Sequence, residues 1–256
     1  MPVTDFVNEV QVPQMDVLAY DYETDLMWCD IGGPNNSTYM LSKWLNWAKQ
    51  NGRQVSFNSR CGLQGDYDTP EYSPNPDEPY ARKWESSRGM DPHSYGYNKV
   101  TPDDAYLTGE DIVKSLIDIT AKNGNFLLDI GPKGDGSIPE IMKTNLRDAG
   151  SWIRERKESI FGTRFWSVTP GDDPFRYTTT EDAFYIHHTG APGDRLDVKD
   201  PVPFVEGDEI TVLGGKANGK KVGHEMKDGV LTLLLDDDVV KGDRYVWTFK
   251  IKYGHQ

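Results

Sequence analysis

The chain has 256 residues, with 41 acidic and 28 basic side chains and a formal net charge of −13. Its length suits one large domain or two ordinary ones, and its composition, 36% hydrophobic and 27% charged, is typical of a folded, soluble protein. An acidic chain repels phosphate backbones, so nucleic acid is not expected as a partner. No apolar run reaches the ~20 residues that a membrane-spanning helix needs, so no membrane contact is expected. The N-terminus shows no signal-peptide pattern, and two cysteines are too few for a disulfide framework.

The first part of the chain alternates between strand and helix patterns. Residues 25–30 (DLMWCD) and 54–59 (QVSFNS) are predicted strands, and the spacing of apolar residues predicts a helix over 37–50 between them. Gly52 follows that helix, as a helix C-terminus prefers. The apolar side chains that share one face of the helix are Tyr39, Met40, Trp44, Leu45 and either Trp47 or Ala48. Residues 60–80 are polar and proline-rich, and too long for a simple connector, so they are a candidate functional loop.

The same alternation continues beyond this loop. A helix is predicted from Thr108 to Asn123, where Thr108 caps the first turn and Asp111 closes a capping box. Residues 125–130 (NFLLDI) form a predicted strand that is apolar on both sides, as a buried strand of a parallel sheet would be. Another helix is predicted over about 139–160. Strands that alternate with helices in this way indicate a parallel sheet or a (β/α) barrel.

After residue 163 the pattern changes to short strands separated by Gly, Asp and Pro turns. The predicted strands here are 183–188, 209–213, 229–235 and 244–253. Such spacing is typical of an antiparallel sandwich. We therefore predict an α/β chain with a (β/α) domain over residues 1–162 and a C-terminal β-sandwich domain over residues 163–256.

The histidines give little support for a metal site. None lies in the first 92 residues, where no His/Cys cluster has the spacing of metal ligands. His187 and His188 are adjacent in a predicted strand and are expected to point to opposite faces, which makes them poor co-ligands. We expect both to be ordinary surface or edge histidines.

Catalytic groups in β/α folds gather at the C-terminal ends of strands. Asp30 ends the first predicted strand and Arg60 the second, while Glu71 and Glu85 follow in later loops. Two carboxylates near aromatic rings suit glycoside hydrolysis, and an arginine can keep one of them ionised. Structural interpretations compete with this one: Asp30 can form a turn, Glu71 can be a solvated loop residue, and Trp28 can belong to the core. By itself the pattern only suggests a hydrolase.

Five segments in order extend this interpretation: DLMWCDIGGPN, NSRCG, GDYDTPEY, KWESSRGMDPHSYGYN and NFLLDIGPKGDGSIPE. They resemble the α-L-fucosidases of glycoside hydrolase family 29, over nearly all of residues 1–165 and more weakly beyond. The resemblance implies a retaining exo-glycosidase on a (β/α) barrel followed by a β-sandwich, with fucosylated glycans or aryl fucosides as substrates and no metal or organic cofactor. It also argues against a phosphate-binding loop at Gly131–Gly136, where the P-loop spacing is missing.

The resemblance implies roles for single residues. Asp30 looks like the catalytic nucleophile, and Glu71, in TPEY, looks like the acid/base, with Glu85 as the alternative acid/base. The substrate-binding residues that the resemblance implies are Trp28, Arg60 and Tyr95. Arg60 matches the arginine that lies against bound fucose, and Tyr95 matches the aromatic residue that meets the C5 methyl group of the sugar. The linkage preference is not indicated.

The chain departs from the family in length. A TIM barrel typically needs ~250 residues, whereas about 160 precede the predicted sandwich here, and the family carries roughly half of its barrel before the nucleophile. The strand candidates, 25–30, 54–59, 125–130 and one near 82–90, predict a truncated, half barrel. Two alternatives follow: an inactive fragment or non-catalytic carbohydrate-binding module, or a minimal enzyme. In either case we expect a homo-oligomer that covers the open sheet edges of the half barrel.

The minimal enzyme would hydrolyse activated aryl fucosides weakly, and its open site would let sugar acceptors compete with water, giving transfucosylation. Its compartment is left open, since family members are often secreted or lysosomal and the chain carries no address of its own. Asn35 and Asn36 begin N-x-[ST] sequons, which are glycosylated only in a secretory eukaryotic host. Cys29, beside Asp30 in a strand, is interpreted as a packing residue.

Overall fold

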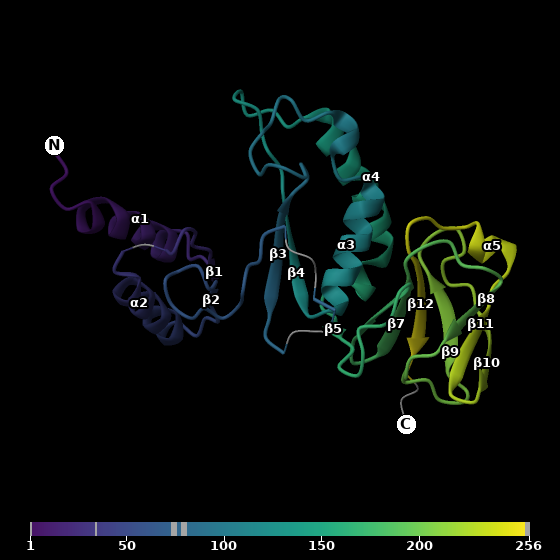
Figure 1. Ribbon diagram of the computed structural model, residues 1–256. Coiled ribbons are helices and arrows are strands. Elements are labelled where there is room, and N and C mark those ends of the chain that lie inside the picture. The colour runs from purple at the N-terminus through teal and green to yellow at the C-terminus, as the bar shows by residue number, and fades with distance from the viewer. Residues whose placement is uncertain (1, 34, 73–75, 78–80, 254–256) are drawn as a thin grey trace. The chain divides into compact units, whose positions relative to one another are not determined.

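The computed structural model describes residues 2–33, 35–72, 76–77 and 81–253 (Figure 1). Their contacts form two compact units. The first unit contains the residues up to Pro70 together with Arg82–Glu85, and the second contains Glu71–Ala81 and the residues from Ser86 onward.

The first unit begins with a helical run that the sequence analysis did not predict. It consists of a wide-turned segment η1 (Val7–Gln11), a regular turn α1 (Val12–Asp16) and a second wide-turned segment η2 (Val17–Asp21), and α1 packs against α2 (Ser37–Gln50).

Two short parallel strands of the first unit carry the predicted β/α pattern. Strand β1 (Leu26–Met27) pairs with β2 (Ser56–Phe57), and α2 connects them. The helix buries Met40 and Trp44, as predicted, but leaves 53% of Tyr39 exposed. It ends at the predicted glycine, because Gly52 adopts a left-handed φ of +66° that suits a glycine.

The long polar loop of the sequence analysis contains a third strand-like segment. Tyr67 forms a parallel bridge with Asn58, just beyond β2, and Asp68 forms one with Trp84 at the start of β3 (Trp84–Gly89). The segment is polar and has only isolated bridges, so its sequence carries no strand pattern. The parallel order β1, β2, 67–68 and β3 confirms the predicted parallel pairing in this unit.

In the second unit, β3 pairs with β4 (Gly124–Asp129), and the helices α3 (Gly109–Ala121) and α4 (Glu140–Arg156) pack together, with α3 also on β4 (Figure 1). Two short 3₁₀ turns flank them, η3 (Asp103–Ala105) and η4 (Lys157–Ser159). The capping box of α3 is confirmed: the Asp111 N–H donates to Thr108 Oγ1, and the Thr108 N–H donates to the Asp111 carboxylate.

The prediction that β4 is buried on both faces is wrong. Phe126 and Leu128 pack into the core of the second unit, but Asn125 is exposed and 39% of Leu127 is exposed. The helix α3 covers only one face of the strand among the described residues. An apolar sequence on both faces therefore does not reveal which of them is covered.

The C-terminal part of the second unit is built from two antiparallel sheets. One sheet has the order β5 (Arg164–Phe165), β6 (Phe175–Thr179), β7 (Ala183–His188), β12 (Trp247–Lys252) and β9 (Glu209–Leu213). The other has the order β10 (Gly223–Lys227), β11 (Val230–Leu234) and β8 (Arg195–Val198), and the short helix α5 (Asp237–Val240) precedes β12. Side chains from both sheets, including Phe249 and Leu231, share one core, which confirms the predicted sandwich. The domain boundary predicted at 162/163 falls between η4 and β5 and stays a prediction.

The two adjacent histidines are buried, not at the surface. Strand β7 lies between β6 and β12, so it is a central strand. His187 is fully buried between the hydroxyls of Thr178 and Thr248, at 3.0 and 3.2 Å, while the His188 ring packs against Phe175 on the opposite face. The expectation of opposite faces is confirmed. The surface or edge interpretation is wrong because β12, from near the end of the chain, pairs with the edge of β7 that β6 leaves uncovered.

His187 gives a prediction about acid stability. Burial lowers the pKa of His187 from its ordinary 6.5 to about 3. Below pH 6.5 the unfolded chain binds a proton that the folded protein does not. The free energy of unfolding therefore decreases as the pH is lowered, and this residue accounts for a decrease of about 2 kcal/mol at pH 5. We expect His187→Gln to lose less thermal stability than the wild type between pH 7 and pH 5. His93→Gln, at an exposed position, is the control, and equal pH dependence in His187→Gln and wild type would contradict the prediction.

Candidate active site

The first unit brings Asp30 and Arg60 together at one end of its parallel strands. Arg60 Nη1 lies 3.0 Å from Asp30 Oδ1, and the N–H of Ile31 donates to the same oxygen at 2.8 Å. The pKa of Asp30 is lowered, first by the hydrogen bond from the Ile31 N–H and then by Arg60. The Asp30 side chain is 55% exposed, so it is an ionised carboxylate within reach of solvent. This arrangement suits a nucleophile.

The turn after Asp30 explains this hydrogen bond. The N–H of Gly33 donates to the backbone carbonyl of Asp30 at 2.9 Å, which closes a tight turn over Ile31 and Gly32. Ile31 has a left-handed φ of +51°, which is strained for a β-branched residue, and its side chain is 93% exposed. The turn thus aims a backbone N–H back at the carboxylate of the preceding residue.

Thr69 and Trp28 both contact the Arg60 side chain. Its Nε and Nη2 donate to the hydroxyl and the carbonyl of Thr69, at 2.7 and 2.6 Å, and its guanidinium lies 5.2 Å from the centre of the Trp28 ring. These contacts leave Nη1 for Asp30. Thr69, which is buried, was missed in the sequence analysis because nothing in GDYDTPEY singles it out.

Trp28 and Glu85 also meet in the first unit. The Trp28 indole N–H donates to the Glu85 carboxylate at 2.8 Å, and Glu85 is only 7% exposed. Burial, the Glu85 charge and Asp66 raise the pKa of Tyr67 to about 12. Trp28 is 38% exposed, so its ring is not a core side chain. The alternative acid/base, Glu85, is thus buried and accepts a hydrogen bond from the exposed ring of Trp28, and its catalytic role stays a prediction.

Glu71 and Tyr95 lie in the second unit, beside one residue of β3. Glu71 forms a parallel bridge with Ser87, and the Tyr95 hydroxyl donates to the Ser87 carbonyl at 2.9 Å. Tyr72 packs the edge of its ring against Tyr95, with ring centres 4.9 Å apart. Glu71 is exposed. The predicted site residues therefore form two groups, Trp28, Asp30, Arg60 and Glu85 in the first unit and Glu71 and Tyr95 in the second.

A disulfide between Cys29 and Cys61 was not predicted. Both cysteines are buried. Cys29 lies just after β1 and Cys61 just after β2, and their Cα atoms are 4.9 Å apart. Interpreting Cys29 as a packing residue was therefore incomplete. Asn58, also missed, is fully buried, and its side chain accepts from the Cys29 N–H at 3.0 Å and donates to the Cys29 carbonyl at 2.9 Å.

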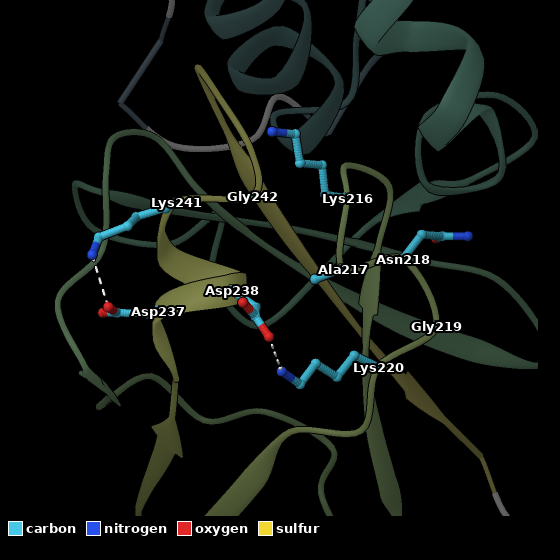
Figure 2. Close-up of a pocket in the computed structure, with 9 residues that line it drawn as sticks. All are labelled: Lys216, Ala217, Asn218, Gly219, Lys220, Asp237, Asp238, Lys241 and Gly242. Atoms are coloured by element: carbon cyan, nitrogen blue, oxygen red, sulfur yellow. Dashed lines mark hydrogen bonds and ion pairs between the residues drawn. The ribbon is translucent and has the colours of Figure 1, made fainter.

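Other parts of the second unit offer less chemistry. Figure 2 shows a hollow of the sandwich between the turn at Lys216–Lys220 and the end of α5. Its charged groups engage each other: Lys241 with Asp237 at 2.7 Å, and Lys220 with Asp238 at 3.2 Å (Figure 2). None of the predicted site residues lines it.

Within the described ranges, no group of three or more His, Cys, Asp or Glu side chains is placed to hold a metal ion. Among the same residues, no helix has the length and apolarity required to cross a membrane.

Comparison with known proteins decides the family. The family model described as alpha-L-fucosidase matches residues 2–158, which is more than half of the chain. The chain belongs to the α-L-fucosidase family. Curated members of this family include the α-L-fucosidase of Dictyostelium discoideum, 30% identical over 82% of this chain and 48% of its own length, and the human plasma α-L-fucosidase, 31% identical over 72% and 40%. The chain thus spans about half the length of the curated relatives it matches.

Solved structures of the family share the fold. One α-L-fucosidase superimposes with a TM-score of 0.83, covering 98% of this chain and 57% of its own, at 24% identity. The α-fucosidase of Thermotoga maritima in complex with a mechanism-based inhibitor superimposes with a TM-score of 0.81, covering 97% of this chain and 57% of its own, at 23% identity. These identities bear on the fold alone. The resemblance seen in the five sequence segments is confirmed at the level of the family.

Proposed function

We propose that the chain carries the catalytic carboxylates of a retaining exo-α-L-fucosidase, on part of a (β/α) barrel followed by the sandwich. The observation that carries this proposal is the Asp30–Arg60 pair. An exposed carboxylate at the end of a parallel strand accepts from Arg60 and from the Ile31 N–H, which keep it ionised and oriented. Membership of the α-L-fucosidase family supports fucosides as the substrate class.

The proposed reaction is a double displacement. A carboxylate oxygen of Asp30 forms a bond to the anomeric carbon of fucose, while Glu71 gives a proton to the departing glycosidic oxygen. Glu71 then takes a proton from water, and the water oxygen replaces Asp30 on the anomeric carbon. Fucose leaves with its original anomeric configuration, and both carboxyl groups return to their starting protonation states.

The environments of the two glutamates support Glu71 as the acid/base. Glu71 is exposed, and the Tyr95 hydroxyl lies on the same β3 residue, so a sugar near Tyr95 would be close to Glu71. Glu85 is buried and accepts from the Trp28 indole, which suits an orienting role for the ring. An aromatic face such as that of Trp28 stacks on the apolar side of a sugar.

The first test is hydrolysis of 4-nitrophenyl α-L-fucoside by the purified chain, with the first-formed fucose anomer identified by ¹H NMR. We expect turnover with α-fucose as the first product, because two displacements retain configuration. Release of β-fucose first would contradict a nucleophilic role for Asp30. A folded chain without turnover would favour the inactive fragment or carbohydrate-binding module, which no observation favours so far.

Two further expectations stay predictions. Transfucosylation would follow if a sugar hydroxyl replaced water in the second displacement. A homo-oligomer would cover apolar surface such as that of Leu127 on β4, which is 39% exposed in the single chain.

A further inference from the structure

The Cys29–Cys61 disulfide joins the two chain segments that carry the proposed nucleophile and its arginine. Cys29 immediately precedes Asp30, and Cys61 immediately follows Arg60. The bond closes a loop with a sequence separation of 32 residues, which contains α2 and β2. One covalent bond thus fixes the backbone on which both functional side chains stand.

Among the described residues, the backbone pairing between these two strand ends is short, and one further backbone hydrogen bond joins them, from the Asn58 N–H to the Met27 carbonyl at 3.3 Å. The ladder between β1 and β2 is two residue pairs long and stops at Met27 and Phe57, before either functional residue. Beyond the ladder, the Asn58 side chain binds the Cys29 backbone. The turn after Asp30 also lies directly on Cys61, since a Cβ at Gly33 would be 2.4 Å from the Cys61 carbonyl carbon. The disulfide thus joins two cysteines whose backbones are contacted by Asn58, at Cys29, and by Gly33, at Cys61.

The Asp30–Arg60 pair does not hold itself in place. Its side chains are 55% and 21% exposed, and ion pairs that solvent reaches contribute little to holding their partners together. The distance of 3.0 Å between Arg60 Nη1 and Asp30 Oδ1 therefore depends on the backbone beneath the pair and, for Arg60, on its two hydrogen bonds to Thr69. The two cysteines under the pair are 6% and 0% exposed, so this support is buried.

We propose that the Cys29–Cys61 disulfide is a positioning element of the site, which holds Asp30 and Arg60 in the geometry that nucleophilic attack requires. This inference rests on the proposed function. A misplacement of about 1 Å in a reacting group can cost about 10²-fold in rate, so loss of the bond reaches catalysis even where the fold persists. Among the described residues, Arg60 is the charged group that acts on Asp30.

The test compares the double variant Cys29→Ala/Cys61→Ala with the wild type at a temperature where circular dichroism shows both folded. The Asp30 carboxyl is titrated by ¹³C NMR, its resonance being the one that Asp30→Asn lacks. We expect the pKa of Asp30 to rise in the double variant toward its ordinary value of about 3.9, and kcat/KM on 4-nitrophenyl α-L-fucoside to fall at least about tenfold.

Ala48→Gly is the matched control. It lies at the C-terminal end of α2, is buried, and lowers stability within the same unit without touching Asp30 or Arg60. A merely stabilising disulfide would make the double variant resemble this control, with a lower melting temperature, an unchanged Asp30 titration and unchanged kcat/KM, and that result would overturn the inference. A double variant that does not fold would also overturn it, because the bond would then serve the fold. If the wild type has no activity, the proposed function fails, and the NMR titration alone decides the positioning role.

Discussion

Replacing Asp30 by alanine is expected to lower kcat on 4-nitrophenyl α-L-fucoside by roughly 10³- to 10⁵-fold, the scale of losses seen when a catalytic nucleophile is removed. The loss should be in kcat because the carboxylate forms a bond to the anomeric carbon only in the reaction. The structure gives the reason for the large effect: Arg60 and the Ile31 N–H both orient this carboxylate and favour its ionised form. The loss in kcat is measured as the rate of nitrophenol release at saturating substrate.

A matched control for Asp30→Ala is Asp25→Ala. Asp25 lies just before the other end of β1, where it pairs with Arg53 at 2.7 Å, so its loss removes an ion pair from the same strand but not from the site. We expect Asp25→Ala to keep kcat within about twofold, because exposed ion pairs contribute little. Sodium azide added to Asp30→Ala should restore product formation as β-fucosyl azide, since azide would enter from the side that the carboxylate left. A kcat of Asp30→Ala within tenfold of the wild-type value would show that Asp30 is not the nucleophile.

The parts of the structure that the sequence predicts are those with local causes. The capping box of α3 depends on Thr108 and Asp111, three residues apart, and it forms as predicted. Gly52 ends α2 because the turn there needs a left-handed residue. The meeting of Asp30 and Arg60 was also predictable, because parallel strands joined by a helix place their C-terminal ends side by side.

The parts that the sequence does not predict depend on partners far away in the chain. His187 is buried because β12, about 60 residues later, pairs with β7 and makes it a central strand. The Cys29–Cys61 bond depends on the register of β1 against β2, which two isolated cysteines do not reveal. The hydrogen bond from Trp28 to Glu85 spans 57 residues, so the sequence did not show that the Glu85 carboxylate is buried against this ring.

Replacing Glu71 is expected to affect substrates according to their leaving groups. Without an acid, departure of a poorly activated alcohol slows by about 10³-fold or more, whereas nitrophenolate leaves without protonation, so its release falls less. Glu71→Ala should therefore lose more kcat/KM on a fucosylated disaccharide than on 4-nitrophenyl α-L-fucoside. Azide should partly restore turnover of the aryl substrate and give α-fucosyl azide, because it would replace water in the second displacement. The azide product thus differs in configuration from the one expected with Asp30→Ala.

Glu85→Gln separates this role from that of the rival glutamate. The amide keeps the size of the side chain and an oxygen that accepts from the Trp28 indole, but it removes the charge from the 2.8 Å hydrogen bond. We expect KM to rise by a few-fold for both substrates, since the ring is held less firmly. Any change in kcat should be the same for the disaccharide and for 4-nitrophenyl α-L-fucoside. The opposite pattern, a selective loss on the disaccharide in Glu85→Gln and an even loss in Glu71→Ala, would make Glu85 the acid/base. The buried position of Glu85 would then mean that the first unit opens around Trp28 before the sugar is cleaved.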